Sequence, residues 1–306
     1  MRKNNFNKRR KKIVVFICSL IIILGAFITY KYSEEKTTQK NEILQASIDN
    51  EADNSSDNSE QKENDNDNKD NNSENDDNIN MDENSFDAGQ IQDFLVKNIK
   101  IQDGKKIVYL TFDDGPSTTV TPKILKILKD NNIKATFFIV GDKLEESPET
   151  KNILLDIYKQ GHAIANHTYT HNYSKLYPQG KIDANTFMGE LVQTNDAIKK
   201  VLGDKFNTRV VRFPGGHASW GGREEIDNKL EEKKYKYIDW NALIGDAEGG
   251  RKTKEQLLNR YHETFVGQEK LVLLMHDTYT KESTAEALQD IITDLKNKGY
   301  EFKTLK

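Results

Sequence analysis

Apolar, strand-like runs alternate with helical patterns along the last two thirds of this chain, and that alternation constrains the fold most strongly. Strands separated by helices form parallel sheets, because each helix carries the chain back before the next strand begins. The strand-like runs are Ile107–Phe112, Ala135–Val140, His162–Asn166, Val210–Pro214, Tyr235–Trp240, Leu271–Met275 and Glu301–Leu305. The helical patterns are Pro122–Asn131, Glu149–Gln160, Thr186–Leu202, Arg223–Lys234, Thr253–Phe265 and Thr284–Lys298.

The order of these elements predicts an α/β fold, a distorted (β/α)7-8 barrel, closed or nearly closed, over residues 91–306. A barrel fits better than an open sheet because polar candidate residues follow the carboxyl ends of several strands, where barrel active sites form. The first helix is expected to begin with Thr121 as its N-cap and Pro122 at its first position.

The N-terminal segment has the pattern of a membrane anchor. Residues 1–12 form a basic tail, and residues 13–30 are 18 residues without a charge. At 1.5 Å per residue they span about 27 Å, close to a hydrocarbon core of about 30 Å. A cleaved signal peptide would have a shorter apolar core and a small-residue cleavage site, which this segment lacks. The pattern therefore predicts a single-pass transmembrane signal anchor with a cytoplasmic N-terminus and the rest of the chain outside the cell.

Residues 31–90 read as a linker between the anchor and the folded part. Residues 34–90 carry 18 acidic and four basic residues, with many Asn and Ser. Such a segment buries too little apolar surface to offset chain entropy, so we expect disorder. Residues 91–306 carry 33 basic and 31 acidic residues, a balance that excludes a typical nucleic-acid surface. The one cysteine, Cys18, permits no internal disulfide.

Two adjacent carboxylates, Asp113 and Asp114, stand where a buried strand meets the turn Gly115–Pro116. In isolation they fit an ordinary polar turn, because Asp, Gly and Pro are common turn residues. The strand end also suits two side chains with separate tasks, one on a metal and one on a reacting water.

His167 and His171 are spaced i, i+4 directly after another apolar strand. On a helical turn this spacing places both imidazoles on one face, a common arrangement for two ligands of one metal. With Asp114 they make a three-ligand set that leaves positions open for water and substrate. Zinc suits these ligands best, and manganese, cobalt and nickel remain alternatives.

Other polar side chains occupy similar positions at strand ends. His276 ends an apolar strand, where a general acid could act. Arg212 and Asp239 also close strands, and Asp246 follows Asp239 after a short loop. Burying a charge costs free energy unless it is paired, so such residues are functional candidates. Trp240 could equally belong to the core.

Taken together, these segments resemble the NodB-homology polysaccharide deacetylases, carbohydrate esterase family 4. The resemblance covers about residues 103–306, in the family's motif order. One departure is Gly215, where the family usually has an aromatic residue. The matching motifs are Thr-Phe-Asp-Asp-Gly-Pro (111–116), His-Thr-x-x-His (167–171), Arg-x-Pro-x-Gly (212–216), Asp239 with Trp240, and Leu-x-x-His (273–276).

The resemblance implies a role for each matching residue. Asp113 matches the general base, and Arg212 matches the residue that orients it. Asp114, His167 and His171 match the metal ligands. His276 matches the general acid, and Asp239 matches the partner that tunes it, with Asp246 a weaker candidate. The Gly215 backbone N–H matches the oxyanion donor, while Trp240 and Leu273 match the pocket for the acetyl methyl group.

The expected function is metal-dependent removal of N-acetyl groups from cell-wall polysaccharide, with N-acetylglucosamine of peptidoglycan as the first substrate. N-acetylmuramic acid, poly-N-acetylglucosamine, chitin oligomers and acetylated xylan are alternative substrates. A deacylase of small amides and a non-catalytic glycan-binding protein are alternative functions, although the complete residue set argues against the latter. The expected partners are the glycan and the cell membrane. The sequence identifies no protein partner.

Overall fold

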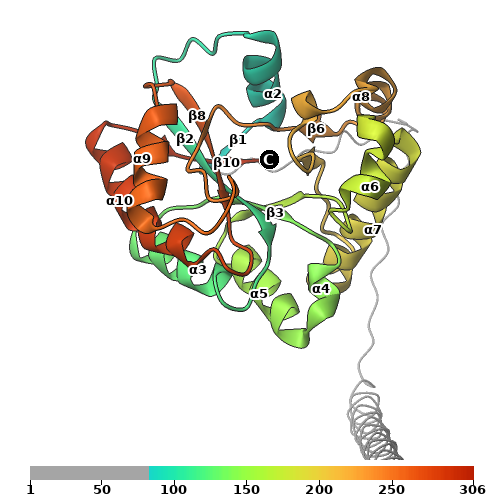
Figure 1. Cartoon of the computed structure of the whole chain (residues 1–306), viewed down its shortest axis with the longest axis horizontal. Helices are drawn as coiled ribbons and strands as arrows, with labels where there is room; N and C mark the ends of the chain where they lie inside the picture. The colour runs from blue at the N-terminus through green and yellow to red at the C-terminus, as the bar shows by residue number, and fades with distance from the viewer. Residues whose placement is uncertain (1–82) are drawn as a thin grey trace, which may run out of the picture. The chain divides into compact units, whose positions relative to one another are not determined.

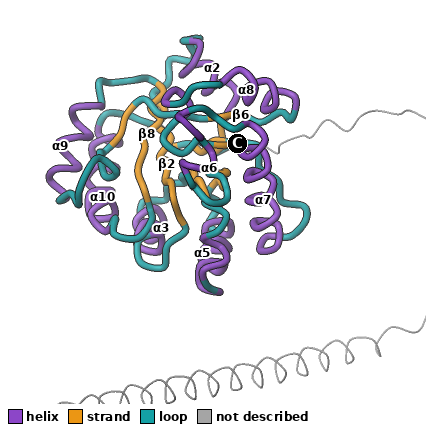
Figure 2. The backbone as a smooth tube through the Cα atoms, turned by 45° about the vertical axis from the view of Figure 1, so that its right-hand side comes forward, coloured by secondary structure: helices purple, strands orange, loops and turns teal. Residues whose placement is uncertain are grey.

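The structure is a computed structural model and describes residues 83–306 (Figure 1). Helices surround a central set of parallel strands, as the tube view also shows (Figure 2). The strands are β1 (Ser85–Phe86), β2 (Ile107–Gly115), β3 (Thr136–Ile139), β4 (Ala163–Asn166), β5 (Val210–Val211), β6 (Lys236–Tyr237), β7 (Ala242–Leu243), β8 (Lys270–His276), β9 (Glu301–Phe302) and β10 (Thr304–Leu305). The helices are α2 (Ala88–Lys97), α3 (Thr121–Asp130), α4 (Lys143–Glu146), α5 (Pro148–Lys159), α6 (Tyr173–Leu176), α7 (Ala184–Leu202), α8 (Arg223–Glu232), α9 (Lys254–Thr264) and α10 (Glu282–Asn297), with 3-10 turns at Pro178–Gly180 and His217–Ser219.

The main sheet has the order β6-β5-β4-β3-β2-β8-β7, with β9 paired to the start of β2. Every described pair in it is parallel, as the alternation of strands and helices predicts. No ladder joins β6 to β7 within residues 83–306, so the sheet is a half-barrel rather than a closed barrel. The gap has a simple cause. The backbone N–H of Ile238 donates to the Val211 oxygen at one edge of the sheet, and the N–H of Asn241 donates to the Val272 oxygen near the other edge. The few residues between them cross from one edge to the other as a loop.

Strand β2 shows how the sheet presents its side chains. Val108, Leu110 and Phe112 belong to the large core cluster shared with the outer helices. Ile107 and Tyr109 belong to a second cluster inside the half-barrel. Because side chains alternate along a strand, the inward face continues through Thr111 to Asp113. The strand therefore delivers Asp113 to the interior at its carboxyl end.

The described part of the chain begins before the expected boundary at residue 91. Strand β1 pairs in parallel with the C-terminal β10, and Asp87 caps helix α2 by accepting from Gln90 N. Residues 83–90, which the composition assigns to the linker, therefore belong to the fold. Polar composition hid a two-residue strand that is held mainly by backbone hydrogen bonds.

The N-cap expected for the first helix after β2 is shifted by one residue. Helix α3 begins at Thr121, with Val120 in the N-cap position and no side-chain capping bond. The Thr121 hydroxyl instead accepts from Ser117 N and donates to Asp277. The Thr121 side chain therefore makes a tertiary contact instead of the capping hydrogen bond that the local pattern predicts.

Within residues 83–306, none of the helices is both long and apolar enough to cross a membrane. The anchor predicted for residues 13–30 and most of the predicted linker lie outside the described residues.

Candidate functional site

Most of the predicted site residues meet around one cavity at the carboxyl ends of the strands. Its volume is about 270 Å³. The lining residues stand at or just after strands β2, β4, β5, β6, β7 and β8, and their positions span more than 160 residues of the sequence. The sequence candidates that line it are Asp113, Asp114, His167, His171, Gly215, Trp240, Asp246 and His276.

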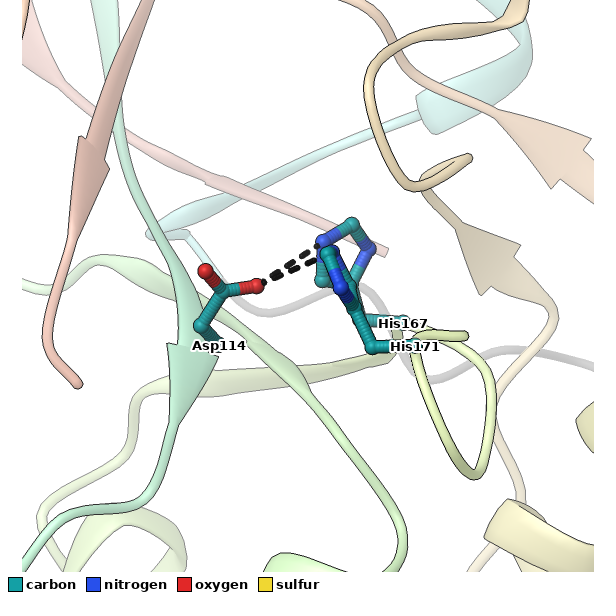
Figure 3. A group of neighbouring side chains, drawn as sticks. All are labelled: Asp114, His167 and His171. Atoms are coloured by element: carbon teal, nitrogen blue, oxygen red, sulfur yellow. Dashed lines mark ion pairs between the residues drawn. The ribbon is translucent and has the colours of Figure 1, made fainter. Parts of the chain in front are cut away.

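Asp114, His167 and His171 form a three-ligand group that could hold a metal ion (Figure 3). Oδ1 of Asp114 lies 3.4 Å from Nε2 of His167 and 3.2 Å from Nε2 of His171. That oxygen is buried and has no hydrogen-bond partner in the described part of the chain. An unsatisfied buried carboxylate oxygen facing two imidazole nitrogens fits a divalent cation.

The imidazole of His167 is oriented for such a role. Its Nδ1 lies 2.8 Å from the backbone oxygen of Arg212, which can only accept a hydrogen bond. Nδ1 therefore carries the proton, and the Nε2 lone pair faces Asp114. Metal-binding histidines are commonly fixed by an acceptor on the other ring nitrogen in this way. His167 is 2% exposed, so the surrounding side chains enclose the ring.

The two histidines lie on a loop, not on the helical turn that their spacing predicts. Thr168 has φ 65° and His171 has φ 51°, both in the left-handed region, and these residues interrupt any helix. The loop turns so that the two rings lie 4.9 Å apart, centroid to centroid. His167 and His171 therefore lie close together, as their i, i+4 spacing predicts, but a left-handed loop and not a helical turn brings them there.

Glu190 on α7 holds this loop in place, and the sequence analysis missed it. Its buried carboxylate accepts from Tyr169 N at 3.0 Å, Thr170 N at 2.9 Å and the Thr170 hydroxyl at 2.6 Å. A buried carboxylate with three donors fixes the backbone between the two histidines. In the sequence Glu190 is one acid within an amphipathic helix, and no local signal separates it from a solvated one.

Asp113 and Asp114 both reach the cavity although adjacent strand residues normally face opposite sides. Asp114 has φ 70°, and the pairing of β2 with β3 shifts register between Asp113 and Gly115. This bulge turns the second carboxylate toward the same cavity. Bulges next to active sites often redirect a side chain in this way.

Arg212 is fully buried and anchors Asp113. Nη1 of Arg212 donates to Asp113 Oδ1 at 2.7 Å and to the Thr111 hydroxyl at 2.8 Å. Its Nε donates to the Ile238 backbone oxygen at 2.8 Å, and the guanidinium lies 4.1 Å from the centre of the Phe138 ring. Every direction of the guanidinium is therefore occupied, and Asp113 is held in one position.

The expected pairing of Asp239 with His276 is wrong, because Asp246 occupies that position. Nδ1 of His276 lies 2.9 Å from Asp246 Oδ1, and the His276 backbone N–H donates to Oδ2 at 2.8 Å. The Asp239 carboxylate instead accepts from the backbone N–H of His217 at 3.0 Å. Asp239 follows β6 and Asp246 follows β7. The path of the chain between them decides which of the two carboxylates lies beside His276 on β8.

These contacts set the charge states of the cavity. Burial by itself would lower the pKa of His276, but the negative charge and hydrogen bond of Asp246, helped by Asp114, raise it to about 9. Burial also acts against the charged form of Asp114, but the nearby imidazoles of His276, His171 and His167 hold its pKa below the ordinary range. Burial, reinforced by His167, lowers the pKa of His171 to about 4. His276 is thus protonated and His171 neutral at neutral pH.

The expected methyl-pocket residue Leu273 does not line the cavity. It is fully buried in the core cluster on the helix side of the sheet, whereas Leu274 lines the cavity with Trp240. The reason is the strand period of two: His276 and Leu274 share a face, and Leu273 points the other way. Leu243 on β7, which had no distinctive sequence signal, also lines the cavity.

Comparison with known proteins agrees with this geometry. A family model described as polysaccharide deacetylase matches residues 100–238. A peptidoglycan-N-acetylglucosamine deacetylase of Bacillus cereus is 32% identical over 207 residues, which are 66% of this chain and 67% of that protein. The peptidoglycan-N-acetylmuramic acid deacetylase PdaA of Bacillus subtilis is 29% identical over 206 residues, 66% of this chain and 70% of that protein.

Among solved structures, a Streptococcus mutans CE4 esterase is similar with a TM-score of 0.66 and 35% sequence identity. The similarity covers 72% of this chain and 92% of that one. The motif order, the half-barrel and the cavity are thus accompanied by similarity over most of the described residues. This chain belongs to the polysaccharide deacetylases of the NodB-homology type, carbohydrate esterase family 4.

Proposed function

We propose that the protein removes N-acetyl groups from cell-wall glycan by metal-dependent hydrolysis, with N-acetylglucosamine of peptidoglycan as its substrate. The observation that carries the proposal is the convergence of Asp113, the Asp114–His167–His171 group and His276 on one cavity. The B. cereus relative, a peptidoglycan-N-acetylglucosamine deacetylase, supports the choice of sugar.

Asp114, His167 and His171 would hold the cation, and zinc suits this mixed carboxylate and imidazole set best. When bound, a divalent cation polarises a carbonyl and lowers the pKa of water. The remaining steps belong to side chains of this chain. Asp113, whose Oδ2 lies 3.7 Å from Nε2 of His167, accepts the proton from the attacking water.

His276 then supplies a proton to the leaving amine. Its Nδ1 is held by Asp246, so Nε2 is the atom that donates, and it lies 4.0 Å from Oδ2 of Asp114 beside the metal group. Gly215 lines the cavity, and its backbone N–H is the proposed donor to the oxygen that gains charge in the transition state. Trp240 and Leu274 surround the acetyl methyl group in this scheme.

N-acetylmuramic acid is the second candidate sugar, because a B. subtilis relative of similar identity is a peptidoglycan-N-acetylmuramic acid deacetylase. Loss of an acetyl group from either sugar changes the mass of a muropeptide equally, so the intact mass does not tell them apart. Tandem mass spectrometry of muropeptides from a deletion strain does, because cleavage between the two sugars shows which one carries the free amine. Wall glycan with an unchanged content of both deacetylated sugars would refute peptidoglycan as the substrate.

We further infer from the sequence that residues 13–30 hold the catalytic part at the outer face of the cell membrane, where it would meet the wall. The basic residues before this apolar segment support that orientation. Protease treatment of intact cells tests it: the part after residue 30 should be cleaved, and full protection would contradict the orientation.

Acetate release from defined glycans is the direct test of activity. The full-length chain should release acetate from a β-1,4-linked tetramer of N-acetylglucosamine, lose this activity with a chelator and regain it with zinc. Asp113→Asn should reduce the rate by at least 100-fold. Asp130→Asn is the matched control, because Asp130 is exposed on α3 and forms a surface ion pair with Lys126. Full activity in the presence of chelator would contradict metal dependence.

A further inference from the structure

An aromatic cluster lies beside the catalytic cavity and has no part in the proposed chemistry. We define it as Tyr173, Tyr177 and Trp220. Tyr173 at the start of α6 is 46% exposed and lines the cavity, whereas Tyr177 is 3% exposed and Trp220 is partly buried. The exposed part of the Tyr173 ring is therefore open to a ligand that enters the cavity.

The cluster occupies the space beside Gly215, the position where the family usually has an aromatic side chain. A Cβ atom on residue 215 would lie 3.2 Å from a Trp220 ring atom and 3.3 Å from the Tyr173 hydroxyl oxygen. The backbone there has φ +77°, a conformation that side chains rarely adopt. Residue 215 therefore has no side chain, and the rings of Tyr173 and Trp220 lie close to the space that its side chain would fill.

The cluster is held rigidly. Trp220 Nε1 donates to the Pro214 backbone oxygen at 2.9 Å, and its ring stacks on Tyr177 with centroids 4.0 Å apart and planes 14° apart. Tyr173 lies 5.4 Å from Trp220 and 5.3 Å from His171, centroid to centroid. Tyr173 is therefore supported on one side by Trp220 and adjoins the metal group on the other.

The size of the cavity indicates what such a ring would contact. At about 270 Å³ it lies below the usual range for drug-sized ligands, so a glycan chain must continue over its edge. Pyranose rings present apolar C–H faces, which pack well against a rigid aromatic surface. Tyr173 is the half-exposed aromatic residue that lines this cavity.

We propose that Tyr173 is a stacking platform for a sugar ring of the N-acetylated glycan next to the reacting acetamide, and that Trp220 is a positioning residue that holds the platform. This inference rests on the proposed function and adds a residue that determines substrate affinity. The ring does the binding, so an aromatic replacement keeps the platform and an aliphatic one removes it.

The test compares variants at Tyr173 with the full-length protein and the N-acetylglucosamine tetramer as substrate. We expect Tyr173→Ala and Tyr173→Leu to raise KM about three- to tenfold while kcat changes less than twofold. Tyr173→Phe and Tyr173→Trp should keep KM within about twofold of the parent, since stacking needs the ring and not the hydroxyl. Tyr158→Ala is the matched control: Tyr158 is 50% exposed on α5 and lines a different cavity.

Calorimetric titration of the tetramer into chelator-treated protein measures binding without turnover and should show the same order of variants. A parent-like KM and affinity for Tyr173→Leu would overturn the platform, as would a Tyr173→Phe variant as weak as Tyr173→Ala. If the parent protein binds the tetramer through Tyr173 but releases no acetate, the proposed function fails and the platform stands. If the parent protein releases acetate and Tyr173→Ala does so equally well, the proposed function stands and the platform fails.

Discussion

Replacing Asp246 by Asn isolates the charge that keeps His276 protonated. Asn has nearly the same shape, and its amide oxygen can still accept from Nδ1 of His276, so the change removes the negative charge 2.9 Å from Nδ1 together with the second acceptor, which the His276 backbone N–H uses. The pKa of His276 stands at about 9 against an ordinary value of 6.5. This difference corresponds to about 3 kcal/mol of favourable interaction with the imidazolium.

The sign of the expected effect follows from the role of His276. A general acid must carry its proton, so activity is present below the pKa of His276 and is lost as pH rises through it. The parent should remain active to about pH 9, whereas the variant should lose activity at a clearly lower pH, because burial acts against the imidazolium and only Asp114 and Asp113 still favour it. For a variant pKa equal to the ordinary value of 6.5, the protonated fraction at pH 8 falls from about nine tenths to about one thirtieth, a loss of about 30-fold.

The assay is the pH profile of kcat/KM for acetate release, with the metal content of each sample measured. Asp239→Asn is the control, because the Asp239 carboxylate contacts the His217 backbone instead of His276. The loss of activity of Asp239→Asn at alkaline pH should occur at the same pH as in the parent. The reasoning is refuted if Asp246→Asn lowers activity equally at every pH, or if Asp239→Asn shifts the alkaline loss of activity instead.

Two further predictions concern the supports of the site. Arg212→Met should lower the free energy of unfolding by about 3–5 kcal/mol, measured by urea denaturation, because it leaves the buried Asp113 carboxylate without its partner; a loss below 1 kcal/mol would contradict this. Glu190→Gln should weaken zinc binding about tenfold in calorimetry while Glu224→Gln, an exposed change on α8, does not, because Glu190 holds the loop between His167 and His171. Equal zinc affinity in both variants would show that the loop holds its shape without Glu190.

Local sequence patterns predicted the elements of the fold well. The apolar runs appear as strands and the amphipathic runs as helices, within a few residues of their expected ends. These features depend on side-chain periodicity, which is written directly in the sequence. Helices α2, α4 and α6 were missed, and the last predicted strand is two, β9 and β10. The short strands β1 and β7 were missed because two-residue strands have no periodicity and are defined by their partners.

The sequence also identified most of the candidate site, since His167, His171 and His276 belong to a residue type that occurs six times in the chain, and Asp113 and Asp114 adjoin at a conspicuous strand end. It could not assign the residues that act on them. Asp239 and Asp246 are both acids near one strand end, and the choice between them depends on how the loop after β6 crosses the open side of the half-barrel.

Sequence by itself thus determined the α/β fold class, the family and the candidate reacting groups, because periodicity and residue type are local properties. Tertiary structure alone decided the partners of those groups: Asp246 for His276, Glu190 for the histidine loop, Leu274 in place of Leu273, and the aromatic cluster beside Gly215. Each of these depends on contacts between segments far apart in the chain. Such contacts follow from packing and backbone path, which local residue patterns do not specify.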